Sequence, residues 1–183
     1  MFIIWLIILI IALYFWLNYM DYRHTEQTVP ENSARIILRC PDKTTKNILG
    51  NKHEHMAIVE GQDRTVYFPD SANTSEHYYL TGVEFTPSFT SYTTTKGHGG
   101  RALVGGLVAG VPGAIIGASG KHKSKITTME NSSDCYLQLF KKEDLLKPVI
   151  LKVTAKSDKV EFLQARMKLT DPEINHIFAV EQA

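Results

Sequence analysis

This sequence of 183 residues has almost no excess of either sign of charge, and it has few cysteines. The 20 basic and 19 acidic residues leave a formal net charge of +1, whereas a general nucleic-acid binder needs a basic excess for its phosphate contacts. The two cysteines, Cys40 and Cys135, are too few for a secreted scaffold stapled by disulfides. Both lie on apolar faces of expected strands, which favours buried thiols; a disulfide stays open if the domain faces an oxidising compartment.

The sequence also lacks the motifs of phosphate loops and of common active sites. A Walker-type loop ahead of Gly120 would need glycine in place of Ile115 and a hydroxyl residue in place of His122. The G-x-G-x-x-A pattern that starts at Gly97 has neither the following carboxylate nor the βαβ unit of a dinucleotide site. No serine lies in a nucleophile elbow. We therefore expect no enzymatic activity and no cofactor.

A polar face is missing from the N-terminal residues. From Phe2 to Leu17 every residue is apolar or aromatic, and about 20 helical residues span the hydrocarbon core of a bilayer. A signal peptide would need a basic leader and a small-residue cleavage site, which are absent here. We expect residues 1–20 to be an uncleaved signal-anchor and single-pass helix in the cell membrane, with a buried core helix as the alternative. Its interfacial aromatic belt would consist of Trp5, Tyr14, Trp16 and Tyr19.

Basic residues are found only after this anchor. Arg23, Arg35 and Arg39 follow it, and no Lys or Arg precedes it. The positive-inside rule then favours a cytoplasmic soluble domain. Residues 21–33 are polar and aperiodic, so we expect a linker between the anchor and that domain.

Short runs of β-branched and aromatic residues dominate the rest of the chain. They form a first β block at residues 34–95 and a second at 126–156. Residues 157–183 predict two helices. Val160, Leu163 and Met167 share a helix face, and residues 170–173 have the pattern of a capping box with proline in the first turn. The sequence thus predicts an α+β fold with a mainly β soluble domain and C-terminal helices. The expected strands are 34–40, 56–59, 65–68, 78–85, 89–95, 125–129, 134–140 and 148–154.

A glycine-rich insert at residues 96–125 separates the two blocks, and its central part, 102–119, carries no charge. Its small residues recur at helical spacing on both sides of a proline, which is typical of close helix packing in lipid. We expect a glycine-zipper hairpin that packs in or on the membrane, or against other copies. A straight second span and a soluble loop are the alternatives. The residues assigned to this packing are Gly106, Gly110, Pro112, Gly113 and Gly117.

Positive charge flanks the insert, and no acidic residue occurs between Glu84 and Glu130. Such an excess suits anionic headgroups, although ordinary snorkelling needs no specific lipid. The flanking cations are Lys96, Arg101, Lys121, Lys123 and Lys125.

The string GRALVGGLVAGVPGAIIGASGKHKSK resembles the glycine-zipper segment of small, mostly uncharacterised membrane proteins of bacteria and phage. In those proteins a basic patch likewise precedes a β block. The resemblance covers residues 96–125 and, more loosely, the block that follows. It implies membrane association and names no activity.

These observations predict a non-enzymatic, membrane-anchored protein with lipid contacts and a β domain that binds a protein partner of unknown identity. A homo-oligomer would form through the glycine zipper. Two alternatives stay open: a lipid-surface sensor or transport module built on a pleckstrin-like barrel, and a membrane-perturbing oligomeric effector. His53 and His55 could share a strand face as metal ligands, but no third ligand is defined, so an exposed loop without a metal is expected there.

Overall fold

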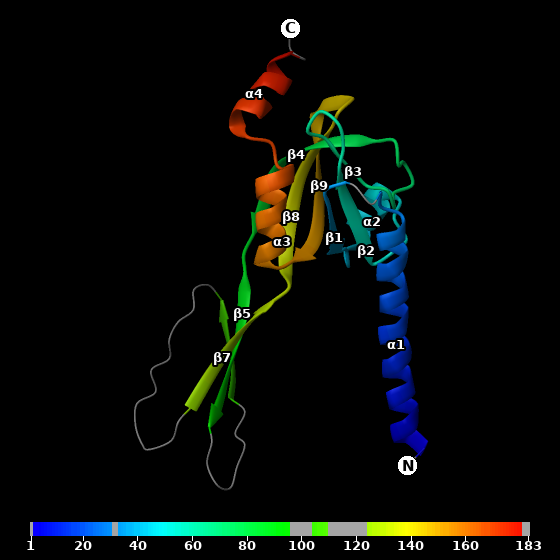
Figure 1. The fold of residues 1–183 in the computed structure, drawn as a ribbon, viewed down its shortest axis with the longest axis vertical. Helices are drawn as coiled ribbons and strands as arrows, with labels where there is room; N and C mark the ends of the chain where they lie inside the picture. Colours follow the sequence, from blue (N-terminus) through cyan, green and yellow to red (C-terminus); the bar gives the residue numbers. More distant parts are fainter. Residues whose placement is uncertain (1, 31–32, 96–103, 110–123, 181–183) are drawn as a thin grey trace.

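The computed structural model describes residues 2–30, 33–95, 104–109 and 124–180 (Figure 1). Its first element is α1, a helix from Phe2 to Gln27. Within the described residues, α1 is the one helix long and apolar enough to cross a membrane, and it is compatible with a membrane anchor or a signal sequence. The large apolar side chains of residues 3–20 are exposed, including the four aromatic residues assigned to the interfacial belt.

The helix extends beyond the apolar stretch. Residues 21–27 are helical, which corrects the expectation of a linker over this part of 21–33. The physical reason is tertiary contact. Thr25 is fully buried, and Val29, just after the helix, packs against Ile37, Ala57 and Val59 of the barrel. A polar segment with no helical period of its own is therefore held in a helix by the surface that it covers.

Six antiparallel strands close into a barrel in the order β1-β2-β3-β4-β8-β9. The barrel closes between β1 and β9 at a single residue pair, Arg39 opposite Thr154. The bounds of the strands are β1 Arg35–Arg39, β2 His55–Glu60, β3 Val66–Tyr67, β4 His77–Phe85, β8 Ser133–Lys141 and β9 Asp144–Ala155.

The barrel interior is filled by alternate residues of these strands, as expected for a half-buried sheet. Cys135, Leu137 and Leu139 on β8 are fully buried, and the residues between them face outward. Ile36 and Leu38 of β1 belong to the same core cluster. The alternation in the sequence therefore predicted the inward face of both strands correctly.

A short helix, α2 (Lys43–Leu49), lies between β1 and β2 and was not expected from the sequence. The Asp42 side chain accepts a hydrogen bond from the Thr45 N–H at its start, and Gly50 ends it with a left-handed φ of 63°. Leu49 is its buried apolar contact with the core. One apolar anchor in seven residues gives too weak a period to reveal a helix.

Two helical segments follow β9. Helix α3 (Ser157–Phe162) continues into a π-helical turn, Leu163–Met167, and places Val160, Leu163 and Met167 in the barrel core as predicted. Ser157 begins the helix, and its N–H and hydroxyl both donate to Glu130.

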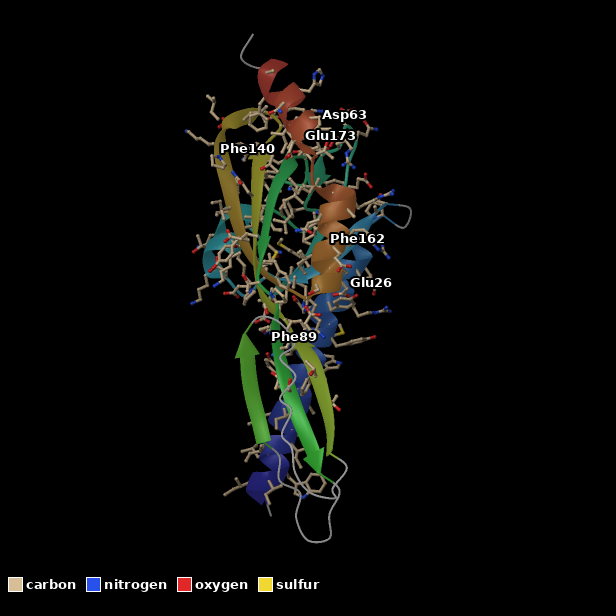
Figure 2. The ribbon with its side chains drawn as sticks, turned by 90° about the vertical axis from the view of Figure 1, so that its left-hand side faces the viewer. Glu26, Asp63, Phe89, Phe140, Phe162 and Glu173 are labelled. Atoms are coloured by element: carbon tan, nitrogen blue, oxygen red, sulfur yellow. The ribbon has the colours of Figure 1, made fainter. Side chains whose placement is uncertain are left out.

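The last helix, α4 (Asp171–Val180), begins at the predicted capping box. Glu173 accepts the N–H of Thr170 at 2.7 Å, as such a box requires. The apolar stripe of α4 packs on the outside of the barrel, where Phe178 meets Phe140 edge-to-face at 5.0 Å between ring centroids. Phe140 and Glu173 mark this end of the molecule in Figure 2.

A separate three-stranded sheet, which we call the arm, extends out of the barrel in the order β6-β5-β7. Its strands are β5 (Ser88–Thr95), β6 (Val104–Ala109) and β7 (Ser124–Asn131). Strand β5 follows β4 and β7 precedes β8, so the arm continues the paired strands β4 and β8 beyond the end of the barrel. In both views the arm and the N-terminal part of α1 project from the same end of the barrel (Figures 1 and 2).

Strand β6 corrects the expectation of a helical glycine-zipper hairpin. Residues 104–109 pair with β5 in antiparallel register, with Gly106 opposite Ser91. Glycine stabilises a helix only where close packing replaces its poor propensity, whereas the edge of β5 supplies hydrogen-bond partners to any extended segment. The other assigned residues, Gly110, Pro112, Gly113 and Gly117, lie outside the described residues. So do all the flanking cations except Lys125, which lies opposite Thr94 in β7.

Candidate functional site

The carboxylate of Asp21 joins α1 to the barrel at the point where the apolar stretch ends. Its Oδ1 lies 2.6 Å from the Nδ1 of His53, and its Oδ2 lies 2.9 Å from the Nδ1 of His55. Oδ2 also accepts the backbone N–H groups of Glu54 and His55, each at 3.0 Å. An ionised carboxylate only accepts hydrogen bonds, so both imidazoles carry their proton on Nδ1. We call this arrangement the Asp21 junction.

The environment of Asp21 favours its charged form. Burial alone would raise the pKa of this carboxyl group, but the hydrogen bonds from His55 and His53 outweigh it and hold the pKa below its usual value of 3.8. A carboxyl whose folded pKa is lowered stabilises the fold above its unfolded pKa. The contribution of the junction is therefore complete at neutral pH and is lost as the pH falls through the lowered pKa.

Further contacts extend the junction along α1. The ring of His24 stacks on His53 at 4.7 Å, and Tyr22 meets His55 edge-to-face at 5.6 Å. Beyond the helix, the Thr28 hydroxyl donates to Asp70 at 2.6 Å. The barrel is thus fixed to α1 through more than one turn of the helix, immediately after its apolar stretch.

The two histidines considered as metal ligands have their Nδ1 atoms engaged by Asp21. His53 lies in the bend before β2 with a side chain 36% exposed, as the expected loop requires, whereas His55 begins β2 and is only 17% exposed, which corrects the expectation for that residue. Among the described residues no group of three or more His, Cys, Asp and Glu side chains is placed to hold a metal ion. Sequence reasoning missed the partnership because 32 residues separate Asp21 from His53.

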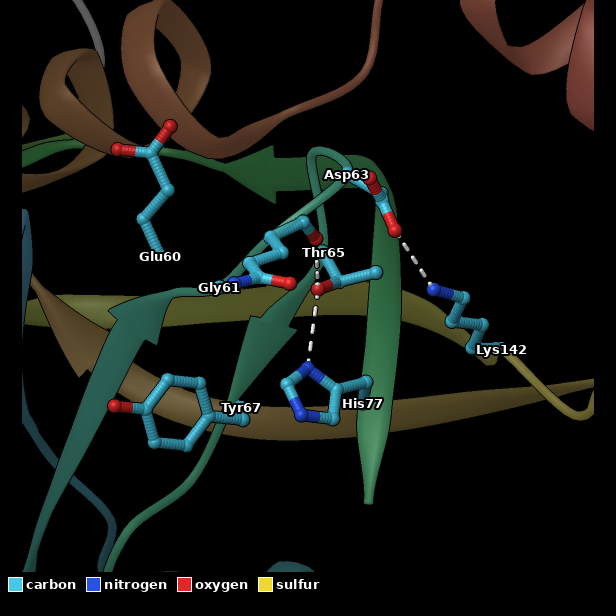
Figure 3. A pocket seen from close by; sticks show the side chains of 8 residues that line it. Glu60, Gly61, Asp63, Thr65, Tyr67, His77 and Lys142 are labelled. Carbon is cyan, nitrogen blue, oxygen red and sulfur yellow. Dashed lines mark hydrogen bonds and ion pairs between the residues drawn. The ribbon is translucent and has the colours of Figure 1, made fainter. Parts of the chain in front are cut away.

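A cavity of about 620 Å³ lies at the opposite end of the barrel, beside the loop between β2 and β3 (Figure 3). Thr65 and His77 meet in its wall at 3.1 Å, and Lys142 pairs with Asp63 at 3.0 Å. The Thr65 hydroxyl donates its single proton to the Gln62 carbonyl at 2.6 Å. His77 must therefore donate its Nδ1–H to Thr65, so the imidazole does not activate this hydroxyl as a nucleophile.

The two cysteines are equally unsuited to nucleophilic chemistry. Cys40 and Cys135 are free thiols with fully buried side chains, in agreement with the sequence-based expectation. Burial raises the pKa of each thiol to about 11. Because the thiolate is the reactive form, both groups are unreactive at neutral pH.

Comparisons with known proteins do not place this chain in a family. A scan of family models found no match, and searches of curated proteins and of solved structures also found none.

Replacing Asp21 by Asn should loosen the barrel from α1. An amide nitrogen cannot accept the N–H groups that now point at Oδ2, and hydrogen bonds to a charged group contribute about 2 kcal/mol each. We expect the amides of Glu54 and His55 to exchange hydrogen roughly thirtyfold faster in Asp21→Asn. Hydrogen exchange of the full chain in detergent micelles measures this.

The matched control is Glu26→Gln (Figure 2), which removes a partly exposed carboxylate whose one ion-pair partner among the described residues is Arg23, at 3.2 Å on the same helix. We expect unchanged hydrogen exchange in this variant. Equal protection of the two amides in the wild type and Asp21→Asn would contradict the assignment of the junction.

Proposed function

We propose that this chain is a non-enzymatic, single-pass membrane protein that holds its barrel at the membrane surface and offers it to a protein partner. One observation carries the proposal. Asp21 is the first charged residue after the apolar stretch of α1, and the same residue makes the hydrogen bonds that fix the barrel. A bilayer that surrounds the apolar stretch would therefore have the barrel directly on its surface, with no free tether.

The outer face of β8 and β9 supports the role of a partner-binding surface. Tyr136 and Ile150 are 40% and 57% exposed on this face, and Leu146, near the β8–β9 turn, is 87% exposed. Lys152 lies over the Tyr136 ring at 5.7 Å, which adds a cation beside the apolar side chains. Exposed aromatic and aliphatic side chains with a charged neighbour are typical of protein interfaces.

Orientation follows from the basic residues after the anchor. Arg23, Arg35 and Arg39 would lie on the cytoplasmic side under the positive-inside rule. Protease added outside intact cells should leave residues 24–95 uncut, whereas the same protease should digest them in inverted membrane vesicles. Digestion in intact cells and protection in inverted vesicles would reverse the topology.

A second candidate function, a membrane-perturbing oligomer, is favoured by the direction of the arm. The eight residues of β5 reach about 26 Å, close to the roughly 27 Å of helical residues 3–20, and both project from the same end of the barrel (Figure 1). The outer edges of β6 and β7 are unpaired within the described residues. In hydrocarbon such edges need partners, and arms of other copies would supply them.

Crosslinking separates the two candidates. Thr127→Cys places an exposed thiol on the edge strand β7, and Leu146→Cys places one at the far end of the barrel as the control. If arms pair in the membrane, a short thiol crosslinker should give a crosslinked dimer with Thr127→Cys alone, because Cys40 and Cys135 are buried and each copy then carries one accessible thiol. A purely monomeric Thr127→Cys in native membranes would eliminate the oligomer.

A further inference from the structure

A second cavity, of about 430 Å³, lies at the end of the barrel from which α1 and the arm project. We call it the basic cavity. Ser132, between β7 and β8, is one of the polar residues that line it. The others come from α1, β1, β2, β9 and the start of α3, and they are Tyr22, Arg39, His55, Thr154, Lys156 and Lys159. The β-ladder brings these elements together, because Arg39 lies opposite His55 on one side and Thr154 on the other.

The lining of the basic cavity carries three cations and no carboxylate. The other two cavities described in this structure differ in this respect. The cavity of Figure 3 contains Glu60 and Asp63, and the cavity at the base of the arm contains Glu84 and Asp134. The basic cavity is therefore the one of the three suited to an anion.

Three carboxylates around the basic cavity are engaged by other groups. Asp21 is held by the two histidines, and Glu54 pairs with Arg39 at 3.0 Å. Glu130 accepts the N–H and the hydroxyl of Ser157. The charge of Arg39 is thus partly balanced by Glu54 and that of Lys159 partly by Asp158, whereas Lys156 forms no ion pair among the described residues.

Lys156 and Lys159 form no ion pair with a carboxylate of the described residues. Lys159 is half-buried and donates to the Ile37 carbonyl across the seam between α3 and β1. Burial lowers the pKa of Lys159, although Asp158 partly opposes this. An anion in the cavity would give this ammonium group the negatively charged partner that it lacks among the described residues.

The position of the basic cavity beside α1 indicates which class of anionic ligand would fit it. Tyr22 in its wall follows directly after Asp21, and the exposed apolar side chains of α1 begin at Met20 on the same helix. A molecule in the cavity would therefore have its charged group against the barrel and an apolar tail alongside α1. That combination describes a lipid.

We propose that the basic cavity binds the phosphate group of an anionic phospholipid from the membrane that holds α1. Lys156 and Lys159 supply the charge, and Arg39 contributes the donors that Glu54 leaves free. This inference rests on the proposed function, since it requires α1 to be in the bilayer. It assigns the barrel a lipid ligand in addition to its protein partner.

Binding of short-chain lipids to the full chain in uncharged detergent tests the proposal. Titration with dihexanoyl phosphatidylglycerol should give saturable heat by calorimetry, and dihexanoyl phosphatidylcholine should give at least tenfold weaker binding. Lys156→Gln should weaken the phosphatidylglycerol affinity about fivefold, because one basic residue near an anionic headgroup contributes about 1 kcal/mol. Lys147→Gln, an exposed lysine at the other end of β9, should leave the affinity unchanged.

Inorganic phosphate distinguishes a lipid site from a site for free phosphate. Phosphate that competes weakly with phosphatidylglycerol supports the shared phosphate chemistry and the added contribution of the lipid. Phosphate that binds while phosphatidylglycerol does not would overturn the lipid assignment. Equal affinity for the two lipids, or equal loss in Lys156→Gln and Lys147→Gln, would overturn it as well.

Two controls keep this result separate from folding and from the proposed function. Lys159→Gln also removes the hydrogen bond to the Ile37 carbonyl, which could destabilise the fold. Its lipid affinity therefore counts only if its thermal unfolding midpoint equals that of Lys156→Gln. If the midpoints differ, the test rests on Lys156→Gln. Retention of the full chain in membranes after alkaline extraction reports on α1 alone. Retention without lipid discrimination rejects the cavity assignment, whereas loss of retention rejects the proposed function.

Discussion

The half-buried carboxylate of Asp21 is the central contact between α1 and the barrel. Asp21 lies at the end of an apolar helix, where an unpaired charge would be costly to remove from water. Two imidazoles and two backbone N–H groups of the barrel replace the water that the carboxylate loses there. This contact fixes where the barrel lies relative to α1.

The elements that the sequence predicted well are those whose burial is encoded locally. The alternation around Leu137 and the helical spacing of Val160, Leu163 and Met167 each identify a buried face without knowledge of its partner. The start of α4 is equally local, because Thr170 donates both its N–H and its hydroxyl to Glu173, three residues on. These signals sufficed for an α+β fold with an apolar N-terminal helix and a mainly β domain.

The elements that were missed depend on partners distant in the chain. Gly106 fits a helix by spacing alone, but the free edge of β5 makes it part of a strand. Residues 21–27 are helical beside the barrel, where Thr25 is fully buried and Asp21 bonds to β2 and the bend before it. The Asp21 junction joins residues 32 and 34 positions apart, and the basic cavity combines residues from α1 to α3. The spacing of His53 and His55 drew attention to the two histidines but not to their partner. The candidate site was therefore beyond sequence reasoning, while the scaffold that carries it was not.

A measurement of which end of the barrel lies nearer the bilayer tests most directly whether Asp21 holds the barrel on the membrane surface. Spin labels at Lys156→Cys and Leu146→Cys lie near opposite ends of β9, a strand of 12 residues that reaches about 40 Å. With the full chain in vesicles that carry gadolinium-chelate headgroups, the account predicts strong relaxation enhancement at position 156 and weak enhancement at position 146. Equal enhancement at both positions, or stronger enhancement at position 146, would contradict a barrel held with its basic end on the membrane.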